Sequence, residues 1–168
     1  PMAGHLARAG HRVTVYNRTE KKAQQWAQEV GGKSAKTPRE AAAAAQIVFS
    51  CVGNDADLAS VMLGDDGAFV GMRKDAIAVD NTTASAKIAR ELHSEARKRG
   101  LHFVDAPISG GQAGAVNGQL TVMCGGDKPA FDRAQPVAMA FAKAVTLIGD
   151  SGAGQLTKMV NQLCIAGL

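Results

Sequence analysis

Long hydrophobic runs are missing from this chain of 168 residues. No window approaches the roughly 20 apolar residues that a membrane-spanning helix needs, and the first residues lack the pattern of a signal peptide. Cysteine is scarce: Cys51, Cys124 and Cys164 are odd in number, widely separated and each set in an apolar run. This pattern predicts buried, reduced thiols rather than disulfides or a metal framework, so we expect a cytoplasmic protein.

Clusters of charge and of metal ligands are missing too. The formal net charge is only +4 and its Lys and Arg residues are scattered, which favours a solvated surface over nucleic-acid binding. The four histidines, His5, His11, His93 and His102, share no metal-ligand spacing, so no metal is expected. What is present is a hydrophobic content of 46%, enough for one ordered domain with a core.

Segments typical of strands alternate with segments typical of helices. The predicted strands are rich in Val, Ile and Phe and span residues 12–17, 47–52, 76–80, 101–105, 120–124 and 145–148. The predicted helices carry alanine, leucine and charge at helical spacing and span residues 20–30, 37–45, 55–63, 85–99 and 129–143. Thr37 and Pro38 predict an N-cap followed by proline at the first helical position. The alternation predicts an α/β domain with a mainly parallel sheet.

Both ends of the chain have an unusual pattern. Residues 1–10 form the pattern of a helix that ends at Gly10 and leads into a strand. In a doubly wound nucleotide-binding sheet the first strand is central, so we expect a strand and a glycine-rich turn to precede Pro1, and the sheet to be split without them. A last helix, beginning near Leu156, is expected to be still running at Leu168.

Two glycine-bearing motifs carry the candidate chemistry. The first, Asp105-Ala-Pro-Ile-Ser109-Gly110-Gly111, has the composition of a loop that admits a small anion to backbone amides, and Asp105 is expected to end its strand structurally. The second, Gly152-Ala-Gly-Gln-Leu-Thr-Lys158-Met-Val-Asn161-Gln162, lifts a lysine onto the first turns of a helix. A tight turn and a solvated lysine are the structural alternatives.

Helical spacing divides the second motif into two faces. Lys158, Asn161 and Gln162 are related by three and four residues and share one polar face. The apolar residues are expected to cover a neighbouring apolar face; they are Leu156, Met159, Val160 and Leu163.

Four motifs, in order, resemble the β-hydroxyacid dehydrogenase family. They are Pro1-Met-Ala before a helix, Asn17-Arg18-Thr19 after the strand of residues 12–17, and the two motifs above. The resemblance covers the whole chain and implies a Rossmann-like doubly wound domain that binds a dinucleotide, over residues 1–150. Residues 151–168 would then begin an all-α C-terminal domain, whose helices often supply a dimer interface, so a homo-oligomer is expected.

The resemblance also implies roles for the second motif. A carbonyl that accepts hydride must gain a proton, and Lys158 would be the acid, or the base in the reverse direction. Burial and the positive nicotinamide would lower the pKa of its amine. Many family members carry asparagine four residues after the lysine; here Gln162 stands there and Asn161 precedes it, so either amide is a candidate to orient substrate.

The substrate and cofactor positions follow by the same resemblance. The hydroxyl and backbone amides at Ser109, Gly110 and Gly111 would face a small carboxylate. Val52, Gly53 and Asn54 would lie beside the cofactor, and Thr83 near the nicotinamide, although the family usually has a proline-bearing loop where Gly53 and Asn54 stand.

Cofactor choice depends on the residues after the strand of residues 12–17, where a dinucleotide fold meets the adenosine ribose. Asn17, Arg18 and Thr19 stand there, with Lys21 and Lys22 just beyond, so no carboxylate is expected to bind the ribose or to repel a phosphate. The Arg18 guanidinium matches a 2′-phosphate, and its neighbours supply neutral donors. NADP(H) is therefore favoured over NAD(H), with Arg18 as a solvated turn residue the alternative.

The sequence thus predicts an NADP(H)-dependent oxidoreductase that interconverts a small β- or γ-hydroxy acid and its semialdehyde. Two alternatives stay open. One is an imine reductase, a class that shares the architecture but usually replaces the lysine. The other is a dinucleotide-binding or interaction protein without turnover, because fold alone does not fix function.

Overall fold

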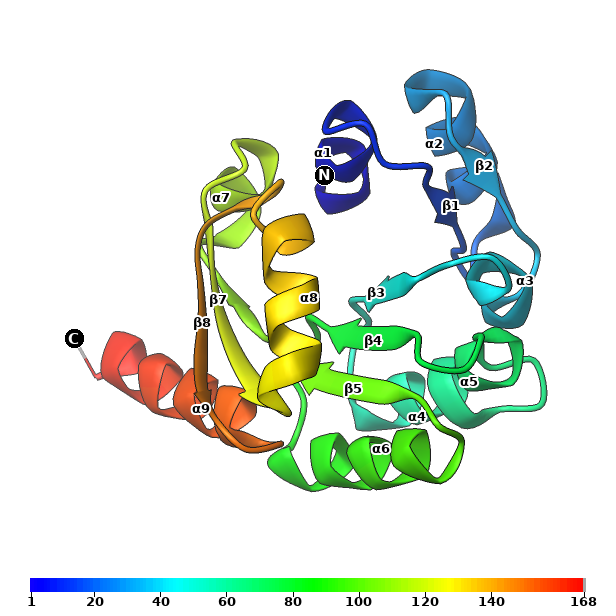
Figure 1. The fold of residues 1–168 in the computed structure, drawn as a ribbon. Coiled ribbons are helices and arrows are strands. Elements are labelled where there is room, and N and C mark those ends of the chain that lie inside the picture. The colour runs from blue at the N-terminus through cyan, green and yellow to red at the C-terminus, as the bar shows by residue number, and fades with distance from the viewer. Residues whose placement is uncertain (168) are drawn as a thin grey trace.

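The computed structural model describes residues 1–167, and most of its strands form one six-stranded sheet (Figure 1). The strand order is β3-β4-β5-β7-β6, with β8 also paired to β7. The strands are β3 (Ile47–Ser50), β4 (Ile77–Asp80), β5 (His102–Asp105), β6 (Ile108–Ser109), β7 (Leu120–Gly126) and β8 (Ala142–Gly149). β3, β4 and β5 are parallel, as are β7 and β8, whereas β7 is antiparallel to β5 and β6. The predicted Rossmann-like α/β fold is confirmed.

A second, two-stranded sheet stands apart from the first. β1 (Thr14–Val15) pairs in parallel with β2 (Lys33–Ser34), and within residues 1–167 neither strand pairs with the larger sheet. Figure 1 shows this pair beside α2 (Glu20–Val30), at the upper right of the view. The sheet is therefore split, as the sequence predicts.

Helices cover both faces of the larger sheet (Figure 1). One apolar core joins α1 (Met2–Arg8) and α8 (Lys128–Ala138) to the sheet, and a second joins α4 (Asp55–Leu63) and α6 (Ala86–Lys98) to it. Along β4, Ile77 belongs to the first core and Ala78 to the second, because successive side chains of a strand point to opposite faces. A strand buried on both faces reads as a continuous apolar run.

Most predicted elements are present. α2 and α4 have the predicted bounds, and α6 differs by one residue at each end. α3 (Pro38–Ala42) begins at the predicted proline, and the Thr37 hydroxyl accepts a hydrogen bond of 3.1 Å from the backbone N–H of Glu40. The predicted N-cap is therefore confirmed.

The differences lie at element ends and in short elements. The strand expected over residues 12–17 is shorter and consists of β1 alone. The helix expected over residues 129–143 ends at Ala138, because residues 142–149 satisfy their backbone groups by pairing with β7. The sequence did not predict β2, β6, α5 (Ala68–Gly71) or α7 (Gly111–Val116). These elements are too short to show a clear period.

The cysteine prediction is correct on pairing and wrong on burial. All three thiols are free, but only Cys124, within β7, is buried. Burial raises the pKa of Cys124 to about 12. Cys51 follows the end of β3 and Cys164 lies on an outward side of α9 (Ala153–Ala166), and both are exposed. An apolar sequence neighbourhood did not reveal on which side of its element each thiol lies.

The last helix is anchored by a buried carboxylate. Asp105, at the end of β5, accepts hydrogen bonds from the backbone N–H groups of Gly152 (2.7 Å) and Gln155 (3.0 Å), which open α9. Asp105 is fully buried. Burial raises the pKa of its carboxyl group, although the hydrogen bonds from those N–H groups act in the opposite direction. Asp105 ends its strand as predicted, and it also caps α9. That helix ends at Ala166 with Gly167 in a turn, short of the predicted run, and Leu168 lies outside the described residues.

A second buried carboxylate links the loops that follow β3 and β4. Asp80 Oδ1 accepts hydrogen bonds from the hydroxyls of Ser50 (2.7 Å) and Thr82 (2.6 Å), and the Thr82 hydroxyl accepts one from the backbone N–H of Val52 (3.0 Å). The other carboxylate oxygen of Asp80 is buried without a partner in the described chain. Burial raises the pKa of Asp80 to about 6, although the bonds from Thr82 and Ser50 oppose the shift.

Close approach of α9 to the sheet requires glycine at Gly154. A Cβ there would meet the carbonyl oxygen of Met123 and, at 2.8 Å, Oδ2 of Asp105. We expect Gly154→Ala to lower the free energy of unfolding by about 1–3 kcal/mol, the usual cost of overpacking. Gly4→Ala is the matched helical control, because its Cβ would meet only the Arg8 side chain, at 3.4 Å. Urea unfolding measures both, and equal stabilities of the two variants would contradict the expectation.

Asp80 predicts a pH dependence of stability. Its folded-state pKa of about 6 lies above the ordinary value of 3.8, so the folded protein holds this proton more tightly than the unfolded chain. Its contribution to stability is therefore fully present below pH 3.8 and is lost as the pH rises through about 6. Relative to Asp80→Asn, the wild type should lose at most about 3 kcal/mol of unfolding free energy across that range. Urea titrations from pH 4 to 7 measure the unfolding free energy of both proteins. If the two free energies changed in parallel with pH, Asp80 would not have this role.

Candidate functional site

The candidate site lies where β3, β4 and β5 end. Parallel strands end at the same edge of a sheet, and ligands of doubly wound folds bind beyond that edge. Val52 follows β3 and Thr83 follows β4, and their loops are joined by the bond from Val52 N–H to Thr82. A second link joins the same loops, since Asp55 Oδ1 accepts a hydrogen bond of 2.8 Å from the backbone N–H of Ser85. The structure thus brings together two of the predicted cofactor segments.

The third predicted cofactor segment connects β1 to α2. Asn17 Oδ1 accepts a hydrogen bond of 2.9 Å from the backbone N–H of Thr19, which shapes a local turn. Arg18 extends from this turn with its side chain 89% exposed, and its guanidinium lies 3.6 Å from a carboxylate oxygen of Asp57 on α4. Because Asp57 lies only three residues after Asn54, the contact places Arg18 next to the β3 loop.

Asp57 is a residue that sequence reasoning missed. Asn17, Arg18 and Thr19 include no carboxylate, and Glu20 begins the next helix. The fold brings the carboxylate of Asp57 to Arg18 from α4. The expectation that no carboxylate is placed to repel a phosphate at Arg18 is therefore wrong, because the Asp57 carboxylate lies 3.6 Å from the Arg18 guanidinium. Asn54 Oδ1 caps α4 by accepting from the backbone N–H of Asp57 (2.9 Å), and Gly53 and Asn54 are both exposed.

Lys158 is buried on α9, with an exposed fraction of 8%. Burial lowers the pKa of its amine, because desolvation disfavours the charged form. Within the described chain its amine makes neither an ion pair nor a hydrogen bond that would offset this effect. The pKa is therefore lowered in the direction that lets an amine release a proton more readily.

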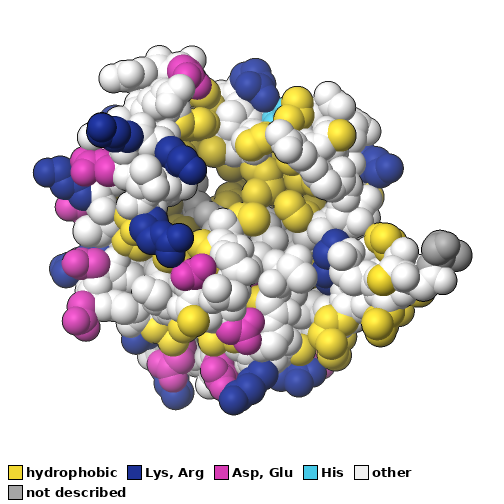
Figure 2. All heavy atoms as spheres, turned by 180° about the vertical axis from the view of Figure 1, so that it is seen from behind, with side chains coloured by type: hydrophobic (Ala, Val, Ile, Leu, Met, Phe, Trp, Pro, Cys, Tyr) yellow, Lys and Arg dark blue, Asp and Glu magenta, His cyan; other side chains and the backbone are white. Residues whose placement is uncertain are grey.

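The two candidate amides differ in burial. Asn161 is half-buried, Gln162 is exposed, and the Asn161 amide donates a hydrogen bond of 3.3 Å to Gln162 Oε1. The apolar residues of the same helix were expected to cover a neighbouring face, and within residues 1–167 they are exposed instead, by 45% to 73%; they are Leu156, Met159, Val160 and Leu163. Figure 2 shows hydrophobic side chains along this protruding helix, at the right of the view.

Ser109, Gly110 and Gly111 lie where β6 leads into α7. Ser109 pairs with Thr121 of β7, and Gly110 and Gly111 follow with φ of 127° and 59°. These conformations are rare for residues with a Cβ, so both glycines are required by the turn. Both are exposed. α9 also packs on β7, where Gly154 approaches Met123, so the two predicted motifs border the same strand.

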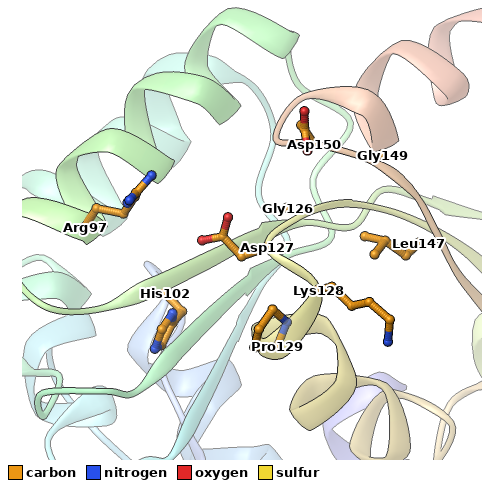
Figure 3. A pocket seen from close by; sticks show the side chains of 9 residues that line it. All are labelled: Arg97, His102, Gly126, Asp127, Lys128, Pro129, Leu147, Gly149 and Asp150. Carbon is orange, nitrogen blue, oxygen red and sulfur yellow. The ribbon is translucent and has the colours of Figure 1, made fainter.

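One pocket of the described chain lies away from all of these residues. A pocket of about 510 Å³ opens beside the start of α8 and is lined by Arg97, Asp127 and Lys128 among others (Figure 3). The Lys128 ammonium is paired with Asp132 at 2.6 Å, and none of the predicted site residues lines this pocket. It therefore gives no support to a substrate site there.

Among residues 1–167, no three His, Cys, Asp or Glu side chains are grouped closely enough to hold a metal ion. In the same residues, no helix is long and apolar enough to cross a membrane.

Comparison with known proteins shows the family to which the chain belongs. Residues 1–149 match the family described as the NAD binding domain of 6-phosphogluconate dehydrogenase. An uncharacterized oxidoreductase of Shewanella frigidimarina is 58% identical over the whole chain, which covers 58% of that protein. A probable 3-hydroxyisobutyrate dehydrogenase-like protein of Arabidopsis thaliana, described as mitochondrial, is 41% identical over 98% of the chain and 54% of its own length.

A solved structure shows the same similarity. Mycobacterium tuberculosis 3-hydroxyisobutyrate dehydrogenase, solved with L-serine, superposes with a TM-score of 0.92 at 31% identity, over 99% of this chain and 56% of its own. The chain thus spans little more than half the length of these relatives. The motifs, the fold and the matched domain agree, and the chain belongs to the β-hydroxyacid dehydrogenase family, with residues 1–149 matching its NAD-binding domain.

Proposed function

We propose that the protein is an NADP(H)-dependent oxidoreductase that interconverts a small β- or γ-hydroxy acid and its semialdehyde. The observation that carries the proposal is the buried Lys158, whose helix is fixed against the ends of the strands by Asp105. Burial lowers the pKa of the Lys158 amine, and an amine that releases its proton more readily suits proton transfer to and from an alcohol oxygen. Family membership supports the same chemistry.

The residues at the sheet edge fit a dinucleotide. The segment at Arg18 and the loop at Gly53 and Asn54 are exposed, polar and adjacent, and we propose that they hold the adenosine end, with Val52 and Thr83 nearer the nicotinamide. The cofactor supplies the hydride when it is bound. The chain supplies orientation, and Lys158 moves the proton.

Arg18 supports NADP(H) over NAD(H). Its contact with Asp57 is long, at 3.6 Å, and largely solvated. Ion pairs of this kind on the surface contribute little to the stability of a protein. A 2′-phosphate offers a stronger, bidentate partner to the guanidinium, so Arg18 is expected to leave Asp57 when the phosphate arrives. Asn17 and Thr19 add neutral donors beside it.

For the substrate, we propose that the Ser109 hydroxyl and the backbone amides of Gly110 and Gly111 bind the carboxylate. Small residues leave room for it, and both glycines are exposed. Asn161 or Gln162 would orient the reacting carbonyl, and the half-buried position of Asn161 favours it.

The relatives are longer than this chain, and their extra length suggests what surrounds it. We propose that residues 151–168 begin an all-α domain, and that the complete protein is a cytoplasmic homo-oligomer assembled through that domain. The exposed apolar residues of α9 support a further helical layer there, and the free cysteines suit a reducing compartment.

Lys158→Met tests the chemistry, because methionine keeps the volume and removes the proton. In the complete protein we expect kcat to fall by about 10²–10⁴-fold, the usual worth of general acid–base catalysis, while NADPH still binds. NADPH oxidation on glyoxylate and on succinic, methylmalonate and tartronate semialdehydes measures this. The exposed Lys143→Met is the control. Full activity of Lys158→Met would refute the assignment, and NADPH binding without turnover by the wild type would favour an imine substrate or a non-catalytic binder.

Arg18→Ala tests cofactor choice. We expect the ratio of kcat/KM for NADPH to that for NADH to fall by about 10–100-fold, the worth of a hydrogen-bonded charge pair. Asp57→Asn should raise this ratio by removing a competing carboxylate, and Arg99→Ala, an exposed arginine at the end of α6, should leave it unchanged. A wild type that prefers NADH would overturn the Arg18 argument.

A further inference from the structure

Gln155 is fully buried between α9 and the loop after β4. Its carbonyl oxygen accepts a hydrogen bond of 3.0 Å from the backbone N–H of Ala84, and its amide nitrogen donates one of 2.7 Å to the carbonyl oxygen of Thr82. The two bonds hold the backbone immediately before and immediately after Thr83. The side chain therefore binds the loop segment proposed to lie near the nicotinamide.

The same residue is tied to the proposed catalytic helix. Its backbone N–H donates to Asp105 Oδ2 at 3.0 Å, and Lys158 follows three residues later, on the same side of the helix. Gln155 and Lys158 are both buried, whereas Leu156 between them is 45% exposed. We call the two side-chain hydrogen bonds of Gln155 to Thr82 and Ala84 the clamp. One turn of helix thus separates the clamp from the Lys158 amine.

Near neutral pH a glutamine satisfies both bonds where its close analogues do not. Asparagine is shorter by one methylene, glutamate in its ionised form has no donor for Thr82, and methionine makes neither bond. A buried polar group that loses its partners costs free energy, so the carboxamide has one favoured position, and with it the loop and the helix.

We propose that Gln155 is a positioning residue that sets Lys158 against the Thr83 loop, and thereby against the nicotinamide. The effect of Gln155 on catalysis rests on the proposed function. Its effect on the positions of the loop and the helix rests on the three hydrogen bonds. Without the clamp Asp105 still caps α9, but the helix is free to shift along the loop and Lys158 becomes more exposed to water.

The test uses the complete protein with Gln155→Met and Gln155→Glu, and Gln135→Met as matched control. Gln135 also donates one side-chain hydrogen bond to a backbone carbonyl, that of Val145 at 3.0 Å, away from the site. We expect both Gln155 variants to lower kcat by about 10–100-fold, as a displacement near 1 Å does, with a smaller change in the Kd for NADPH. The control should keep wild-type kcat.

A pH profile separates positioning from a loss of stability. In the oxidative direction the rate rises with pH as Lys158 loses its proton, and greater exposure in the variants should move that midpoint up, toward the ordinary lysine pKa of 10.5. The activity of Gln155→Glu relative to wild type should also recover as the pH falls, because the protonated carboxyl regains a donor for Thr82. A fold that is only weakened shows a lower Tm and neither pH effect.

One measurement decides the role of Gln155 independently of turnover. The pKa of Lys158, followed by NMR after reductive ¹³C-methylation, should rise in the Gln155 variants and not in Gln135→Met, and an unchanged pKa in the Gln155 variants overturns the proposal. A wild type without turnover on any aldehyde ends the proposed function, while the NMR comparison still decides the role of Gln155. Gln155→Glu keeps the volume and one of the two bonds, so it decides the matter where the methionine variant does not fold.

Discussion

The capping of α9 by Asp105 is the interaction on which the rest of the site depends. A carboxylate fully removed from water is costly, and here two backbone N–H groups at a helix N-terminus stabilise it. The bonds fix where the helix starts, and Gly154 lets the helix backbone lie against β7. The position of Lys158 follows from that start, because a helix rises by about 1.5 Å per residue. Moving the cap would move the amine.

A polar network extends from this cap across the ends of three strands. Gln155 joins α9 to the loop after β4, and the Thr82 hydroxyl joins that loop to Val52 and to Asp80. Buried hydrogen bonds are strong in a low dielectric and allow few alternative arrangements. The loops proposed to meet the cofactor are therefore held by the buried side chains of Asp80, Thr82 and Gln155. The high pKa of Asp80 reflects the desolvation cost of this rigidity.

The adenosine end is built differently. Arg18 and Asp57 meet at 3.6 Å in water, so their arrangement is weakly held and open to competition from a phosphate. The contrast places preorganised geometry near the proposed chemistry and adjustable charge at the end that selects the cofactor. Such a division is consistent with the demands of the two tasks, since proton transfer depends on hydrogen-bond distance and phosphate recognition depends mainly on charge and a matching fork of donors.

The sequence by itself determined the α/β class, the bounds of α2 and α4 and the Thr37 cap, because local spacing and capping chemistry decide such features. Its motifs also identified the family and the residues proposed for the site. Tertiary structure alone decided what lies far apart along the chain: Asp57 beside Arg18, Gln155 around Thr83, and Asp105 beneath α9. It also decided that residues 142–143 join β8 and that Cys51 is exposed. Short-range patterns carry no record of such partners, since a hydrogen bond or an ion pair depends on distance in space.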